Sequence, residues 1–141
     1  MYEVNLWIRL HENVYDGDSG GQYAKATAIA ERVAAWTDPT LAADVRILNG
    51  TFTLTLTCHA NRRRAHETEL IDDLLAEVIR LLPASYGLIY ERDDETTEHP
   101  GHNAFRVTVL ARGKLSIRED PFLSPAYPTI EDPYADLPGE L

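Results

Sequence analysis

The stretch DVRILNGTFTLTLTCH, residues 44–59, predicts a β-hairpin around which the rest of the fold can be arranged. Asn49-Gly50 is the dipeptide most typical of a two-residue hairpin turn, because both positions of that turn need a positive φ. In the second strand, threonines and His59 alternate with four apolar residues, namely Phe52, Leu54, Leu56 and Cys58. Such alternation is typical of a strand that buries one face.

A further strand is expected at the start of the chain, and an amphipathic helix on each side of the hairpin. In residues 2–10, apolar side chains alternate with Glu3, Asn5, Trp7 and Arg9, which places these four on the opposite face. Apolar residues recur at helical spacing over 22–36 and over 66–82. Both stretches are followed by a proline, which ends a helix.

Two more β-rich runs follow, Ser85–Arg92 and Ala104–Arg112, so the expected order is β-α-β-β-α-β-β. This order predicts an α+β fold of the split β-α-β (ferredoxin-like) type, a mostly antiparallel sheet with both helices on one face. The fifth strand is expected beside the fourth, which gives the spatial order 5-4-1-3-2. We expect a single domain over residues 1–118, because 141 residues are too few for two cores of ordinary size.

Residues 119–141 are expected to form an extended tail docked on the domain. This segment holds five of the eight prolines and six acidic residues but no basic one, so a regular helix or central strand is excluded. Large apolar residues nevertheless recur in it, and we expect them to pack on the domain, near the helix-free sheet face; they are Phe122, Leu123, Tyr127, Ile130, Tyr134 and Leu137.

The charge balance narrows the classes of partner. Thirteen basic against twenty-three acidic residues give a formal net charge of −10, which repels nucleic acid and anionic membranes and favours a basic protein. The chain has a single cysteine, no membrane-length apolar run and no leader pattern, so a cytoplasmic location is expected.

Several residue groups invite a chemical interpretation. His99 and His102, together with the Asp93–Glu95 cluster, could form the site of a small metal-dependent or acid–base enzyme. The commoner explanation for such residues is that they are solvated loop side chains. Arg62-Arg63-Arg64 resembles a phosphate-binding run, but pairing with acidic residues of the adjoining helix is the better prediction. Cys58 is expected to face the core, where a thiol is inaccessible as a nucleophile. A non-catalytic module that dimerises through an open sheet edge is a further alternative.

Two stretches carry a resemblance to a known family. LPASYGLIYERDDE (residues 82–95), and ARGKL (111–115) leading through DPFLSP (120–125) to PTIED (128–132), are similar to the immunity protein 7 family of bacterial polymorphic toxin systems. The family usually has Pro-Gly where this chain has Pro83-Ala84. The resemblance extends over most of the chain, and the first sixty residues match only in pattern.

The resemblance implies a cytoplasmic protein that binds and neutralises a cognate toxin, with no catalytic residues, cofactor or metal of its own. A basic toxin domain, for example a nuclease, is the expected partner, and the oligomeric state is not determined. We expect the partner-binding surface to combine two acidic loops with two aromatic residues: Asp93, Asp94, Glu95 and Glu98 after the fourth strand, Asp16 and Asp18 after the first, and Tyr86 and Tyr90 within the fourth.

Overall fold

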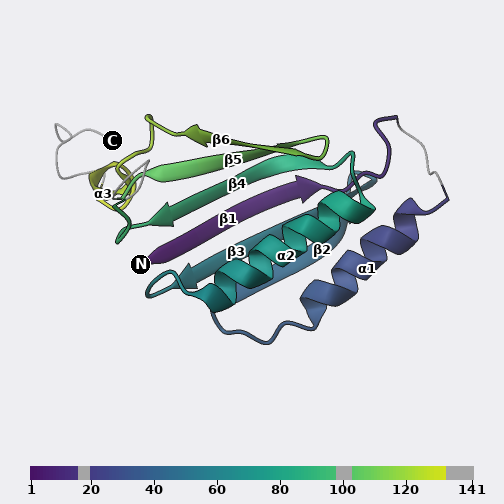
Figure 1. Cartoon of the computed structure of the whole chain (residues 1–141), viewed down its shortest axis with the longest axis horizontal. Coiled ribbons are helices and arrows are strands. Elements are labelled where there is room, and N and C mark those ends of the chain that lie inside the picture. Colours follow the sequence, from purple (N-terminus) through teal and green to yellow (C-terminus); the bar gives the residue numbers. More distant parts are fainter. Residues whose placement is uncertain (16–19, 98–102, 133–141) are drawn as a thin grey trace.

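The computed structural model describes residues 1–15, 20–97 and 103–132, which form an α+β fold with one antiparallel sheet (Figure 1). The α+β class expected from the sequence is confirmed. The elements in chain order are β1 (Tyr2–Arg9), α1 (Gln22–Ala34), β2 (Leu41–Leu48), β3 (Thr51–Ala60), α2 (Ala65–Leu81), β4 (Tyr86–Asp93), β5 (Phe105–Ala111), β6 (Lys114–Glu119) and the short α3 (Ala126–Thr129).

The sheet has six strands in the order β2-β3-β1-β4-β5-β6, where the sequence predicted five. The strand neighbours expected for the first five are the ones observed, and every pairing is antiparallel. β1 lies in the middle, between β3 and β4, as the purple strand of Figure 1 shows.

The sixth strand, β6, was not predicted because the turn before it has no typical turn sequence. Arg112 and Gly113 have φ values of 48° and 83°, close to those of Asn49 and Gly50 at 50° and 78°. Both turns therefore take the φ > 0 conformation of a two-residue hairpin, but arginine rarely adopts it and gives no signal of its own. The alternation of Leu115 and Ile117 with polar residues was the available hint for β6.

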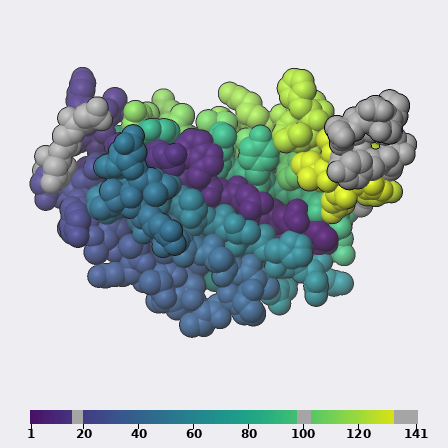
Figure 2. Space-filling model, turned by 180° about the vertical axis from the view of Figure 1, so that it is seen from behind, coloured from purple at the N-terminus to yellow at the C-terminus, as the bar shows by residue number. Residues whose placement is uncertain are grey.

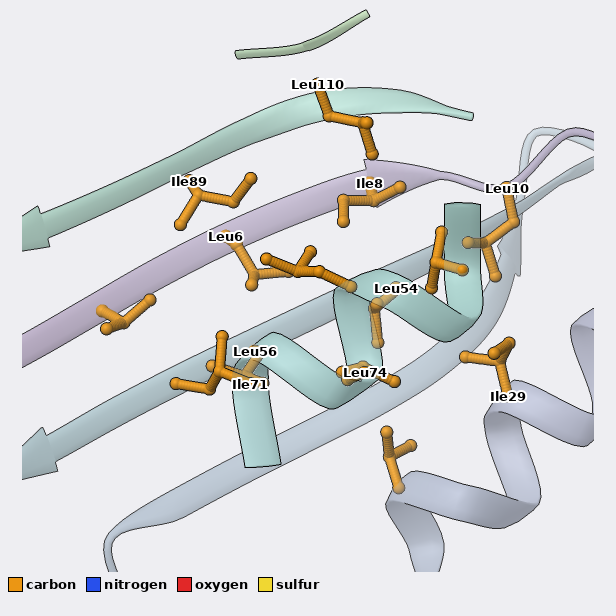
Figure 3. Packing of buried hydrophobic residues seen from close by; sticks show 14 of the residues in the cluster. Leu6, Ile8, Leu10, Ile29, Leu54, Leu56, Ile71, Leu74, Ile89 and Leu110 are labelled. Atoms are coloured by element: carbon orange, nitrogen blue, oxygen red, sulfur yellow. The ribbon is translucent and has the colours of Figure 1, made fainter. Parts of the chain in front are cut away.

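Helices α1 and α2 cover the same face of the sheet, and the core lies between them and strands β3, β1 and β4 (Figure 3). The alternation expected in β1 is observed, since Tyr2, Val4, Leu6, Ile8 and Leu10 are all at most 5% exposed. They meet Leu54, Leu56 and Cys58 of β3, Ile29 of α1, and Ile71 and Leu74 of α2. The other face of the sheet, which we call the helix-free face, is seen in Figure 2 with β1 crossing its middle.

At position 87, the backbone of β4 lies so close to the backbone of β1 that no side chain would fit between them. Gly87 pairs with Ile8, and a β-carbon built on Gly87 would fall on the carbonyl oxygen of Trp7 and 2.8 Å from the Cα of Ile8. The obstacles are backbone atoms of the central strand, which cannot move aside as a flexible side chain can. Glycine at this position is therefore a requirement of strand packing, and no positive φ is involved.

We expect the Gly87→Ala variant to lose about 3 kcal/mol of unfolding free energy, because the added methyl group must push two central strands apart. Chemical denaturation of the two proteins measures the difference. Gly21→Ala is the matched control, since a β-carbon there meets only the flexible side chains of Glu12 and Lys25, and its loss should stay within about 0.5 kcal/mol. Equal losses in both variants would contradict this account of Gly87.

Candidate functional site

The acidic residues after β4 lie where that strand ends, beside the N-terminus of the chain. Asp94 Oδ1 accepts a hydrogen bond from the terminal ammonium of Met1 at 2.5 Å, and Asp93 Oδ1 accepts one from the backbone N–H of Glu95 at 3.0 Å. The Glu95 side chain is exposed. Asp93 thus stabilises the local turn, Asp94 pairs with the N-terminus, and Glu98 lies outside the described residues.

Tyr90 and Tyr86 both point to the helix-free face, but they belong to different ends of β4. Tyr90 packs edge-on against Phe105 with ring centroids 5.8 Å apart. Burial raises the pKa of Tyr90, and the nearby carboxylate of Asp120 raises it further. Tyr86 instead stacks on His11, with ring centroids 5.6 Å apart and the planes 6° from parallel.

The two acidic loops expected to form one surface start from opposite ends of the sheet. β1 and β4 are neighbours, as predicted, but they are antiparallel, so Arg9 pairs with Tyr86 while Tyr2 pairs with Asp93. The chain that leaves β1 toward Asp16 and Asp18 starts at the Tyr86 end, about 23 Å along the strand from Asp93 by the usual rise per residue. The inference from strand adjacency alone overlooked strand direction; Asp16 and Asp18 themselves lie outside the described residues.

A buried arginine connects the acidic end to the tail. Arg92 is 2% exposed and lies on the helix-free face, where its guanidinium meets Glu3 Oε2 at 3.0 Å and Glu131 Oε1 at 2.9 Å. It also donates to Asn103 Oδ1 at 2.7 Å. Burial opposes the charge, yet the carboxylates of Glu131 and Glu3 raise the pKa of Arg92 above its ordinary value.

The described part of the tail is attached through polar contacts. Ala126 N–H donates to the carbonyl of Asn103 at 2.8 Å, and Phe105 N–H donates to Ser124 Oγ at 2.8 Å. The large apolar side chains expected to dock the tail are 41–87% exposed; they are Phe122, Leu123, Tyr127 and Ile130. These four side chains therefore contribute little of the expected apolar packing, and Tyr134 and Leu137 lie outside the described residues.

The opposite end of the helix-free face carries a group of side chains of which only Tyr86 was predicted from the sequence as a binding residue. Trp7 meets Tyr86 edge to face, with centroids 6.4 Å apart at 89°. The guanidinium of Arg9 lies 4.9 Å from the centroid of the Trp7 ring, and that of Arg112 lies 4.7 Å from the centroid of Tyr86. Together with His11, which stacks on Tyr86, we call these five residues the aromatic–arginine cluster.

The two stretches that carry the family resemblance hold this cluster in place. Ala84 N–H donates to the carbonyl of His11 at 3.0 Å, and Ser85 Oγ accepts from the His11 N–H at 3.1 Å. Arg112 donates to the carbonyl of Ala84 at 2.6 Å, while a β-carbon on Gly113 would come within 2.8 Å of the carbonyl oxygen of Pro83. Residues 83–87 and 111–113 therefore interlock at the end of β1. Ala84 has no positive φ, so alanine in place of the family's usual glycine adds no backbone strain.

Sequence alone offered only part of the cluster. Trp7 stood out as a large aromatic residue on the polar face of β1, and Tyr86 was predicted as an anchor residue. Arg112 contacts Tyr86 from the turn between β5 and β6, which was not predicted from the sequence.

The remaining chemical candidates have structural explanations. Arg64 bonds to Glu67, as predicted for the arginine run, and Glu67 is fully buried. Burial opposes ionisation of Glu67, but hydrogen bonds from Arg64 and Thr40 lower the pKa of its carboxyl group. Within residues 1–15, 20–97 and 103–132, no three His, Cys, Asp or Glu side chains lie together as metal ligands. His99 and His102 fall outside those ranges.

A model of immunity protein 7 matches residues 1–132, nearly the whole chain. The chain belongs to the immunity protein 7 family. None of the curated proteins matches it. A solved phage SAM lyase in complex with S-methyl-5'-thioadenosine covers 84% of this chain and 88% of its own, at 11% identity and a TM-score of 0.31. So low a score supports no conclusion about fold or ligand.

The described helices of this immunity protein 7 family member include none with the length and apolarity to span a membrane. Its one cysteine, Cys58, is 1% exposed, as expected for a core-facing side chain. Burial raises the pKa of the Cys58 thiol from 9.0 to about 11, and the carboxylates of Glu67 and Asp38 add to the effect.

This shift predicts alkaline sensitivity. The folded state holds the thiol proton more tightly than the unfolded state, so the stability that the protonated thiol contributes is complete below pH 9 and is lost as the pH rises toward 11. We expect the unfolding free energy of the wild type to fall more steeply over this interval than that of Cys58→Ala. Denaturant titrations at several pH values measure both slopes. Parallel slopes would show that Cys58 has no such role.

Proposed function

We propose that this protein binds one cognate toxin domain in the cytoplasm and neutralises it by stoichiometric inhibition, without turnover. The observation that carries the proposal is membership of the immunity protein 7 family over residues 1–132. An inhibitor of this kind protects the cell that makes the toxin, and its action requires a folded surface complementary to the toxin.

The net charge of −10 favours a basic toxin, for example a nuclease. Opposite charges accelerate diffusional encounter, and an immunity protein must capture its toxin before damage occurs. The acidic cluster of Asp93, Asp94 and Glu95, with Glu98 beyond it, is our candidate for this electrostatic role. Asp16 and Asp18 would add a second acidic point at the other end of β1, and Tyr90 a nearby aromatic contact.

Docking of the whole 119–141 segment on the domain is also a proposal. The contacts from Ser124, Ala126 and Glu131 to the ends of β4 and β5 support it. The tail would then belong to the folded unit that the toxin meets.

Co-expression tests the function directly. The gene immediately upstream is induced in a naive bacterium with and without this protein, and the two products are then purified together. We expect growth to be rescued and a one-to-one complex to be recovered. Toxicity without rescue, or the lack of a complex, would refute the proposal.

A double variant tests the electrostatic role of the acidic cluster. Replacing Asp93 with Asn and Glu95 with Gln should slow association about tenfold at low salt and leave dissociation nearly unchanged, because steering acts on encounter. The difference should shrink as salt is added. Glu69→Gln with Asp73→Asn on the exposed side of α2 is the charge-matched control. If both double variants slow association equally, net charge and not this cluster would be responsible.

A further inference from the structure

Charge is distributed unevenly between the two faces of this acidic protein. The outward side of α2 is rich in acid, with Glu69, Asp72 and Asp73 exposed, whereas α1 carries one acidic residue, Glu31, and two basic ones, Lys25 and Arg32. The acidic residues of the described helix-free face are engaged within it: Glu3 with Arg92, and Asp44 with Arg46. The cations Arg9, Arg112, Lys114 and Arg118 lie on or beside the same face, and no carboxylate of the described residues pairs with them.

The aromatic–arginine cluster is the part of this face best suited to a protein partner. Trp7 remains 37% exposed, although the rings around it fix its position. Tryptophan, tyrosine and arginine are the residue types in which binding energy concentrates. Because ring stacking and cation–π contacts already order these side chains, little further rotamer freedom is lost on binding.

The guanidinium groups of Arg9 and Arg112 determine which ligand groups the cluster can bind. Among the described residues, Arg9 donates one hydrogen bond, to Thr53 Oγ1 at 3.4 Å, and Arg112 donates one, to the carbonyl of Ala84. Each guanidinium has five N–H donors, so most of them remain for a ligand. An arginine positioned over an aromatic ring still has N–H groups available for a carboxylate, which a guanidinium can bind through two parallel hydrogen bonds.

We propose that the aromatic–arginine cluster is the principal docking surface for the toxin, and that the toxin inserts a segment there which combines an acidic side chain with apolar atoms. This inference rests on the proposed function and adds the contact surface and the chemistry of the partner. A standard interface of about 800 Å² per partner is roughly 28 Å across, which is enough to cover the cluster and also reach the acidic residues about 23 Å away.

A single-stranded nucleic acid is the competing ligand, because exposed aromatic residues and arginines on a sheet also stack bases. The net charge of −10 and the carboxylates of Glu3, Asp44 and Glu131 near this face disfavour a polyanion. A protein segment brings only one or two carboxylates, to which the guanidiniums of Arg9 and Arg112 can donate hydrogen bonds. The observations therefore favour the protein partner.

The test compares full-length variants for binding to the purified toxin domain encoded beside this chain. Trp7→Thr keeps a strand-forming residue and removes the ring, and we expect at least thirtyfold weaker binding. Arg9→Gln and Arg9→Glu separate the loss of a donor from reversal of charge. If the toxin places a carboxylate there, Arg9→Glu weakens binding more than Arg9→Gln does.

Two control variants lie on the helix side. Tyr23→Ala removes an exposed aromatic residue from α1, and Arg80→Glu makes the same change of charge on α2 as Arg9→Glu makes on the sheet. Both controls should bind within threefold of the wild type. Circular dichroism and thermal melting confirm that each variant is folded.

The outcomes separate the inference from the proposed function. If the wild type does not bind the toxin, both are refuted. If the wild type binds and the Trp7 and Arg9 variants bind equally well, the toxin docks elsewhere and only this inference is overturned. If Arg9→Glu binds as well as Arg9→Gln or better, the acidic chemistry of the partner is wrong. Tight binding of single-stranded polyuridine that Trp7→Thr abolishes, with toxin binding intact, would assign the face to nucleic acid.

Discussion

The close approach of β4 to β1 at Gly87 is the constraint on which the helix-free face depends. With no side chain at position 87, the backbone of β4 fits against Trp7 and Ile8 of the central strand. Ile8 then packs in the core on one face, while Trp7 meets Tyr86 on the other. A single glycine thus connects packing under the helices with the geometry of the aromatic–arginine cluster.

The two ends of the helix-free face are stabilised in different ways. At one end Arg92 is buried and compensated by Glu3, Glu131 and Asn103, and a buried charge with such partners is costly to disturb because removing one partner leaves the charge unpaired. At the other end Arg9 and Arg112 are held against aromatic rings and have no acidic partner among the described residues. The contacts of Arg92 therefore stabilise the fold, whereas Arg9 and Arg112 keep N–H groups that can donate hydrogen bonds to a ligand.

Hydrophobic periodicity was sufficient to predict most of the fold, because each local pattern agreed with the element it formed. The Asn49-Gly50 turn, the alternation in β1 and the apolar stripes of both helices all led to correct elements, with boundaries within about three residues. β6 was missed because Arg112 occupies a turn position at which Asn or Asp would have been informative. The candidate site was harder to predict, since it depends on which strand ends meet, and adjacency without direction placed two acidic loops together that leave from opposite ends.

The distribution of charge also explains how one small domain can both attract and orient a partner. A uniformly acidic surface would attract a basic toxin in any orientation, and most encounters would be unproductive. Here the outer side of α2 and the end of β4 are acidic, while the cluster end of the sheet presents guanidiniums without acidic partners among the described residues, together with aromatic rings. A toxin with a basic region and a nearby carboxylate would be attracted by the first and aligned by the second, because like charges at the wrong end repel. On this account net charge governs the rate of encounter, and the small cationic region of an acidic protein governs its specificity.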